Sequence, residues 1–162
     1  GLSLPDFRAA ERTFQLLTQV AGRAGRRGQP AEVVIQTRLP ELALWQTLRT
    51  ADPDAFYQTE LNVREQHFLP PVSRIAKLIF SAKTKAGVFT PARKLETLLK
   101  ERGSELFPEK RFQVFVAPAL HPKKHGKYFA NLFVVAAEPE KLLKAVPLPH
   151  CRIDINPVDV VS

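Results

Sequence analysis

Residues 73–82, SRIAKLIFSA, begin the pattern that sets the architecture of this chain. Ala76, Leu78 and Phe80 recur at every second position, which is the period of a β-strand with one buried face. Three more strands are predicted further along, at residues 112–117 (FQVFVA), 128–137 and 151–156 (CRIDIN). The last strand alternates strictly, and its outward positions are Arg152, Asp154 and Asn156.

Two helices are predicted between these strands. Thr90-Pro91 has the residue types of a helix cap and first turn, and apolar side chains follow it at helical spacing. Glu138 and Pro139 open a second, shorter helix. The order strand, helix, strand, strand, helix, strand is the split βαβ arrangement. We therefore expect an α+β, ferredoxin-like βαββαβ domain over residues 72–162, with both helices on one face of an antiparallel sheet.

The chain before this domain is predicted to be mostly helical. A helix is expected over residues 7–26, followed by a short strand at 32–37 (EVVIQT). Two further helices are expected, one after Pro40 and one starting at Asp52-Pro53. Pro70-Pro71 prevents the last helix from continuing, because the residue before a proline is pushed into extended geometry.

The basic charge of the chain is concentrated in its second part. Of 24 Lys and Arg and 16 Asp and Glu, residues 1–60 hold seven of each sign, so the whole net charge of +8 lies after residue 60. Such an excess suits a surface that meets an anionic polymer, although it equally suits a basic surface that only keeps the protein soluble.

Composition excludes several classes of protein. No apolar run approaches the ~20 residues of a membrane-spanning helix. The only cysteine, Cys151, cannot form an internal disulfide or a zinc site by itself, so a cytosolic protein is expected. The sequence holds no methionine and begins at Gly1, and we therefore expect a piece of a longer protein.

Residues 19–26, QVAGRAGR, carry the strongest local indication of chemistry. Gln19, Arg23 and Arg26 share one helix face, beside Gly22 and Gly25. Two guanidinium groups with small neighbours suit a phosphate, because arginine stays charged and presents a planar fork of donors. A solvated basic helix end, favoured by the helix dipole, explains the same residues without a ligand.

This stretch resembles motif VI (Q-x-x-G-R-x-G-R) of superfamily-two helicases, whose arginines reach the γ-phosphate of ATP. Residues 4–37 as a whole resemble the end of the second RecA-like lobe in the PriA family of replication restart helicases. Residues 56–74 (FYQTELNVREQHFLPPVSR), 114–134 and 152–161 (RIDINPVDVV) resemble later segments of the same family. The resemblance thus covers nearly the whole chain.

The resemblance implies three parts: residues 1–37 as the remnant of the second helicase lobe, 38–71 as a helical linker, and 72–162 as the C-terminal domain that binds DNA and partners. It also implies a parent that is an ATP-dependent 3′–5′ DNA helicase. In that parent Arg23 and Arg26 would be catalytic toward the ATP γ-phosphate, but only together with the upstream lobe.

The present chain has no G-x-x-x-x-G-K-[ST] loop, no acidic magnesium motif and no cysteine pair. We therefore expect no ATPase activity and no cofactor in this chain alone. ATP with magnesium, and structural zinc, are implied only for the parent.

Residues 121–129, HPKKHGKYF, predict a DNA contact. Lys123, Lys124 and Lys127 offer phosphate contacts, and one of Tyr128 and Phe129 can face a base because neighbouring residues alternate across a sheet. A solvated hairpin loop with one aromatic in the core is the alternative. His121 and His125 lack a third ligand, so no metal site is expected.

The resemblance further implies a set of partners. These are single-stranded and branched DNA, other primosome proteins, the loader of the replicative helicase, and the acidic C-terminal tail of single-stranded DNA-binding protein (SSB). Lys141 matches the basic residue that holds the SSB tail in this family. We expect a monomer in the bacterial cytoplasm, at the nucleoid and away from membranes.

An RNA-binding ferredoxin-like domain, of RRM or ribosomal type, is the alternative function. The RRM signature requires an aromatic after the glycine that begins the third strand, whereas Gly126 is followed by Lys127.

Overall fold

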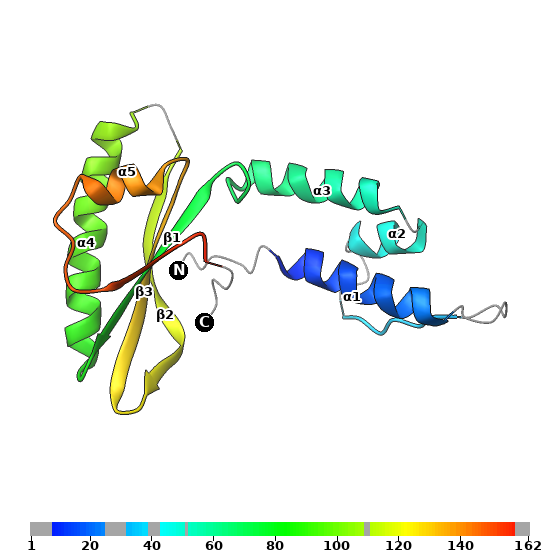
Figure 1. Ribbon diagram of the computed structural model, residues 1–162, viewed down its shortest axis with the longest axis horizontal. Helices are drawn as coiled ribbons and strands as arrows, with labels where there is room; N and C mark the ends of the chain where they lie inside the picture. Colours follow the sequence, from blue (N-terminus) through cyan, green and yellow to red (C-terminus); the bar gives the residue numbers. More distant parts are fainter. Residues whose placement is uncertain (1–7, 25–31, 39–42, 51, 109–110, 158–162) are drawn as a thin grey trace. The chain divides into compact units, whose positions relative to one another are not determined.

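The computed structural model describes residues 8–24, 32–38, 43–50, 52–108 and 111–157. They form two compact units, one within residues 8–66 and the other within residues 67–157 (Figure 1). Within the described ranges, no helix combines the length and the apolar character needed to cross a bilayer. The finer division into residues 1–37 and 38–71 stays a prediction.

The second unit is a four-stranded antiparallel sheet with two helices on one face (Figure 1). Its strands lie in the order β2-β3-β1-β4 and comprise β1 (Arg74–Ala82), β2 (Gln113–Lys124), β3 (Lys127–Ala136) and β4 (Arg152–Ile155). Helix α4 (Lys85–Leu106) connects β1 to β2, and α5 (Pro139–Lys144) connects β3 to β4. The predicted α+β, ferredoxin-like fold is confirmed.

The helix-facing side of the sheet holds the main core. Ala76, Leu78 and Phe80 of β1 are buried there, as their alternation predicts, against Leu95 and Leu99 of α4. The opposite side is also buried over part of its area, where the ring of Phe115 stacks on that of Phe133 with centroids 5.4 Å apart. Both faces of the central strands therefore contribute apolar burial, which is the dominant favourable term in folding.

Helix α4 does not begin at Thr90-Pro91, and that prediction is wrong. The helix begins at Lys85, because the Thr84 hydroxyl oxygen accepts a hydrogen bond from the Gly87 amide at 3.0 Å and caps the first turn. Pro91 lies inside the helix and lacks the N–H that would bond the Gly87 carbonyl. Complete burial of Val88 on one side of Pro91 and Ala92 on the other holds this turn against the sheet.

The first unit contains three helices, α1 (Ala9–Ala24), α2 (Ala43–Thr50) and α3 (Pro53–Gln66). Phe14 of α1 and Phe56 of α3 are both buried and stack with ring centroids 4.1 Å apart. Arg64 of α3 bonds Glu11 of α1 at 3.1 Å. The Asp52 carboxylate accepts from the Ala55 amide at 3.0 Å, so the predicted start of α3 is confirmed.

The strand predicted at residues 32–37 is wrong: the structure gives these residues no strand. A β-strand needs a neighbouring backbone to complete its hydrogen bonds. Every strand in the described part of the chain belongs to the sheet of the other unit, so β-branched side chains alone do not produce one here.

Two helical glycines give opposite predictions for the same substitution. A Cβ at Gly103 of α4 would overlap the Phe112 ring, whereas a Cβ at Gly22 of α1 would meet no atom within 4 Å. We expect Gly103→Ala to destabilise α4 by about 1–2 kcal/mol, because overpacking outweighs the better helix propensity of alanine. Gly22→Ala should stabilise α1 by up to about 1 kcal/mol. Hydrogen exchange, which reports on each helix separately, measures both; slower exchange in α4 of Gly103→Ala would contradict this packing.

Candidate nucleic-acid interface

The predicted DNA-contact residues lie on a β-hairpin whose strands continue almost to its tip. Strand β2 runs on to Lys124 instead of ending at residue 117, and Lys124 pairs with Lys127 of β3. His125 and Gly126 form the two-residue turn with φ of +46° and +71°. Positive φ at both positions is typical of the type I′ turn, which matches the twist of a hairpin. The lysines are therefore held on strands, and the expectation of a longer connecting loop is wrong.

The three lysines do not share one face of the hairpin. Lys123 pairs with Tyr128, and its Nζ lies 5.3 Å from the Tyr128 ring centroid. Tyr128 is half-buried against the core on the helix side. Lys124, Lys127 and Phe129 have the opposite parity and lie on the helix-free face.

Lys124 and Lys127 are direct cross-strand partners with the same charge. Like charges opposite each other destabilise a sheet, and both side chains are exposed. An anion between them would remove this repulsion. The pair is thus better suited to a phosphate-bearing ligand than to a bare protein surface.

A β-bulge beside this pair opens a groove in the helix-free face. Pro118 pairs with Ala130 and Lys123 with Tyr128, so residues 119–122 of β2 lie opposite Phe129 alone. The groove has a volume of about 880 Å³. Six side chains that line it are Lys77, Lys124, Phe129, Asn131, Arg152 and Asp154.

Sequence reasoning missed four of these groove residues, and one of them, Asp154, had only an outward position on the last strand. It gave Arg152 an outward position but no role, and it assigned nothing to Lys77 or Asn131. Lys77 faces Asp154 of β4 and Phe133 of β3, and Ile79 faces Arg152 and Asn131. These neighbours come from strands far apart in the chain, and only the strand register brings them together.

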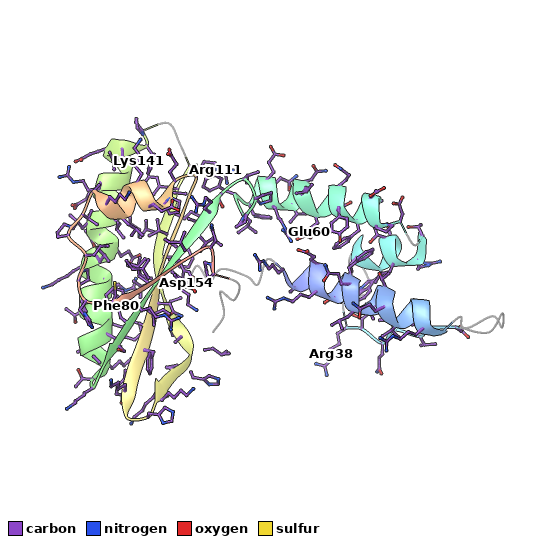
Figure 2. The ribbon with its side chains drawn as sticks, in the orientation of Figure 1. Arg38, Glu60, Phe80, Arg111, Lys141 and Asp154 are labelled. Atoms are coloured by element: carbon purple, nitrogen blue, oxygen red, sulfur yellow. The ribbon has the colours of Figure 1, made fainter. Side chains whose placement is uncertain are left out.

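Lys141 lies on α5 of the same unit (Figure 2). Its side chain is exposed, and its Nζ is 6.0 Å from the centroid of the buried Phe107 ring. The neighbouring Glu140 is instead bound to Arg74 at 2.6 Å. The Lys141 ammonium group has no carboxylate partner among the described residues, so it is available to an acidic ligand.

The described part of the predicted nucleotide motif lies on α1. Gln19, Gly22 and Arg23 are all exposed there, while Gly25 and Arg26 lie outside the described residues. The structure thus leaves Gln19 and Arg23 accessible near the C-terminal end of α1.

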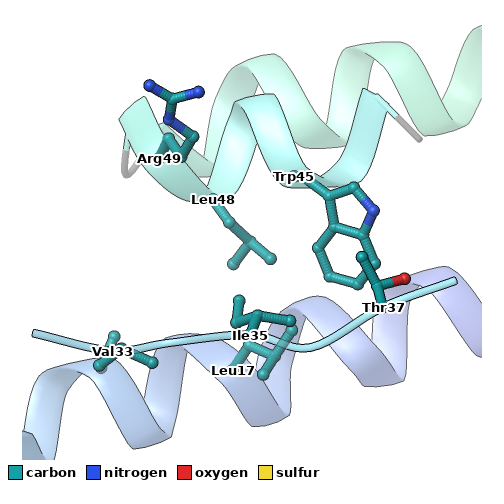
Figure 3. A pocket seen from close by; sticks show the side chains of 8 residues that line it. Leu17, Val33, Ile35, Thr37, Trp45, Leu48 and Arg49 are labelled. Carbon is teal, nitrogen blue, oxygen red and sulfur yellow. The ribbon is translucent and has the colours of Figure 1, made fainter. Parts of the chain in front are cut away.

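A second hollow, of about 420 Å³, lies in the helical unit (Figure 3). Leu17, Ile35, Trp45 and Leu48 line it, with Thr37 and Arg49 as polar members. Trp45 is half-buried there. Because the described residues of this lining include no pair of groups suited to catalysis, we assign the hollow no chemistry.

The pKa values of Glu96 and Cys151 are shifted, and neither of these residues lines the groove. Burial alone would raise the pKa of Glu96, but hydrogen bonds from Lys100 and Arg93, each at 2.8 Å, lower it overall. Burial raises the pKa of the Cys151 thiol, which makes this cysteine a poor nucleophile. Across the described ranges, no three His, Cys, Asp or Glu side chains cluster closely enough to hold a metal.

The like-charge pair predicts an unusual effect on stability. We expect Lys127→Glu to raise the free energy of unfolding by roughly 0.2–1 kcal/mol at low salt, because repulsion with Lys124 becomes attraction. The gain should fade as salt screens it. Lys123→Glu is the matched control and should give no gain, because it removes the cation beside the Tyr128 ring. Urea unfolding at low and high salt measures both variants; a Lys127→Glu protein no more stable than the parent would contradict the repulsion.

Comparison with known proteins gives the family. No family model matches the chain. The protein named replication restart protein PriA from Chlamydia muridarum (strain MoPn / Nigg) is 42% identical over 168 residues, which covers 98% of this chain and 22% of that protein. PriA of Rickettsia conorii is 30% identical over 97% of this chain and 25% of its own length, and PriA of Bacillus subtilis (strain 168) is 43% identical over 61% of this chain and 12% of its own. The chain spans about a quarter or less of the length of the curated relatives it matches, and it belongs to the PriA family of replication restart proteins.

Proposed function

We propose that this chain is the C-terminal region of a PriA-like replication restart protein and binds single-stranded or branched DNA at stalled forks. The binding would use the helix-free side of the β2–β3 hairpin and would help to reload the replicative helicase. The observation that carries this proposal is the exposed, directly opposed pair Lys124 and Lys127 beside a groove that also contains Arg152.

The aromatic contact in this proposal is Phe129. Of the two candidate rings, Phe129 lines the groove and Tyr128 packs toward the core. A basic rim with one accessible ring is the usual composition of a surface that follows a DNA backbone and stacks a base.

An RNA-binding function of the RRM type has less support. Such domains present aromatic side chains on the open face of the sheet so that bases can stack on them. Here Phe115 and Phe133, which occupy the middle of that face, are only 6% and 3% exposed. We therefore keep DNA as the proposed ligand.

The ATP-dependent steps belong to the proposed parent protein. There, Arg23 and Arg26 would contact the γ-phosphate of ATP bound with magnesium by an upstream lobe, and Gln19, Gly22 and Gly25 would shape that helix face. Structural zinc would likewise be held by the upstream part. The remaining proposed partners are other primosome proteins and the loader of the replicative helicase, in the bacterial cytoplasm.

The backbone-binding proposal predicts a strong salt dependence. Replacing Lys123, Lys124 and Lys127 together by alanine should weaken binding to every DNA sequence alike. It should flatten the salt slope by about one to two units, because Lys124 and Lys127 lie on the helix-free face and Lys123 does not. The control variant replaces Lys94 and Lys144 by alanine; both are exposed lysines on helices of the same unit. Fluorescence anisotropy over a range of salt concentrations measures both. An unchanged slope in the triple variant, or an equal flattening in the control, would place the DNA elsewhere.

The SSB proposal predicts loss of peptide binding when the charge of Lys141 is reversed. The acidic tail of SSB would place carboxylates against the Lys141 ammonium group, so Lys141→Glu should weaken binding of a tail peptide at least tenfold, the size of an effect expected for a charge-assisted contact. Lys94→Glu carries the same charge change about three turns before the end of α4 and should bind the peptide normally. Calorimetry with the peptide measures both, and equal losses in the two variants would mean that only net charge matters.

A further inference from the structure

Asn131 is buried in the floor of the groove with an unused hydrogen-bond donor. The residue is 2% exposed, and its side-chain Nδ2 has no acceptor among the described residues. A buried amide without a partner opposes folding, and such groups are rare in native proteins. An apolar residue of similar size would avoid this penalty. We therefore infer that a bound ligand supplies the hydrogen-bond acceptor for the Asn131 amide.

The groups around Asn131 define the chemistry of that ligand. On one side, Asn131 of β3, Ile79 of β1 and Arg152 of β4 form a row across three neighbouring strands. Two strand spacings separate β3 from β4, which is about 10 Å. On the other, Phe129 lies two residues earlier on the same face of β3, next to the bulge. Lys124 adds positive charge to the lining, and among the described lining residues Asp154 contributes a carboxylate.

One class of ligand matches all three features of the groove. These are the hydrogen-bond donor in its floor, the aromatic ring beside that donor, and the cations at both edges. Inorganic phosphate would use the cations but not the ring. An apolar ligand would leave the Asn131 amide unpaired. A nucleotide uses all three, because its base stacks and offers acceptors on its edge, while its phosphates are anionic.

We propose that this groove binds one unpaired nucleotide of a bound DNA strand. The base stacks on Phe129 and accepts a hydrogen bond from Asn131, and the flanking phosphates contact Lys124 and Arg152. This inference rests on the proposed DNA-binding function and adds to it a base-dependent contact. The hairpin lysines account for backbone binding, whereas the groove distinguishes a strand with bases from one without.

The test compares a short oligo(dT) with an abasic deoxyribose-phosphate strand of the same length, using the full chain. The parent protein should bind oligo(dT) about tenfold more tightly, the size expected for one stacked base. Asn131→Leu should abolish this preference while its resistance to urea stays the same or rises, because the unpaired amide is gone. Phe129→Leu should abolish it as well.

Two matched controls should keep the preference. Gln113→Leu replaces a half-buried amide on the same sheet face outside the residues that line the groove. Tyr128→Leu removes the neighbouring ring, which faces the core. The triple alanine variant of Lys123, Lys124 and Lys127 should weaken binding to both strands and flatten both salt slopes.

The outcomes separate this inference from the proposed function. Equal affinity of the parent for the two strands overturns the nucleotide groove and leaves backbone binding standing. Binding of neither strand overturns both. A preference for oligo(dT) that persists in Asn131→Leu also overturns the inference. So does free dTMP that binds as tightly as the strand. The inference is likewise overturned if the variants lose the preference only when they also lose their fold.

Discussion

Strand β1 is the constraint on which the rest of the sheet unit depends. It is hydrogen-bonded on both edges, to β3 over all nine of its residues and to β4 over four. A strand paired on both sides cannot rotate, so each of its side chains is fixed to one face of the sheet. Ala76, Leu78 and Phe80 are thereby committed to the helices, and Lys77 and Ile79 to the groove. A slip of one residue would exchange the core with the groove.

The groove follows from the same register combined with a local departure from it. Strand β2 leaves regular pairing between Pro118 and Lys123 and then resumes it for the last pairs before the turn. The bulge removes side chains from the space above Phe129, while the resumed pairing sets Lys124 against Lys127. An edge of the sheet is thus changed from closed packing to an open, positively charged surface. Repulsion between like charges and unpaired polar groups both lower the free energy of unfolding. Binding sites often keep such groups, because a bound ligand relieves the repulsion and pairs the polar atoms.

The helical unit is held by a different kind of contact. The face-to-face stack of Phe14 on Phe56 joins α1 to α3, and the Arg64 bond to Glu11 lies between the same two helices. Around these contacts the packing is loose, since Leu16 and Val20 of α1 and Val34 after it remain exposed. Singly exposed apolar side chains are common on protein surfaces, so their exposure by itself assigns this unit no partner.

The sequence by itself determined the class of fold, the family, and the order of strands and helices in the sheet unit. Period-two alternation is a local property, so residues 73–82 and 151–156 identify their strands and faces without knowledge of their partners. Local reasoning failed where a partner decides the outcome. Residues 32–37 have the composition of a strand but no neighbouring strand, and α4 starts at Lys85 because the Thr84 hydroxyl accepts a hydrogen bond from the Gly87 amide.

The residues of the candidate site also fall into two groups, those that the sequence identifies and those that only the fold brings together. The lysines of the hairpin could be named from charge, but their separation onto two faces, and the choice of Phe129 over Tyr128, required the position of the bulge. Asn131, Lys77 and Arg152 had no local signature, because their meeting depends on the register of three strands distant in the chain. Tertiary structure decided these residues, since cross-strand neighbours are set by long-range pairing and not by the spacing of residues along one strand.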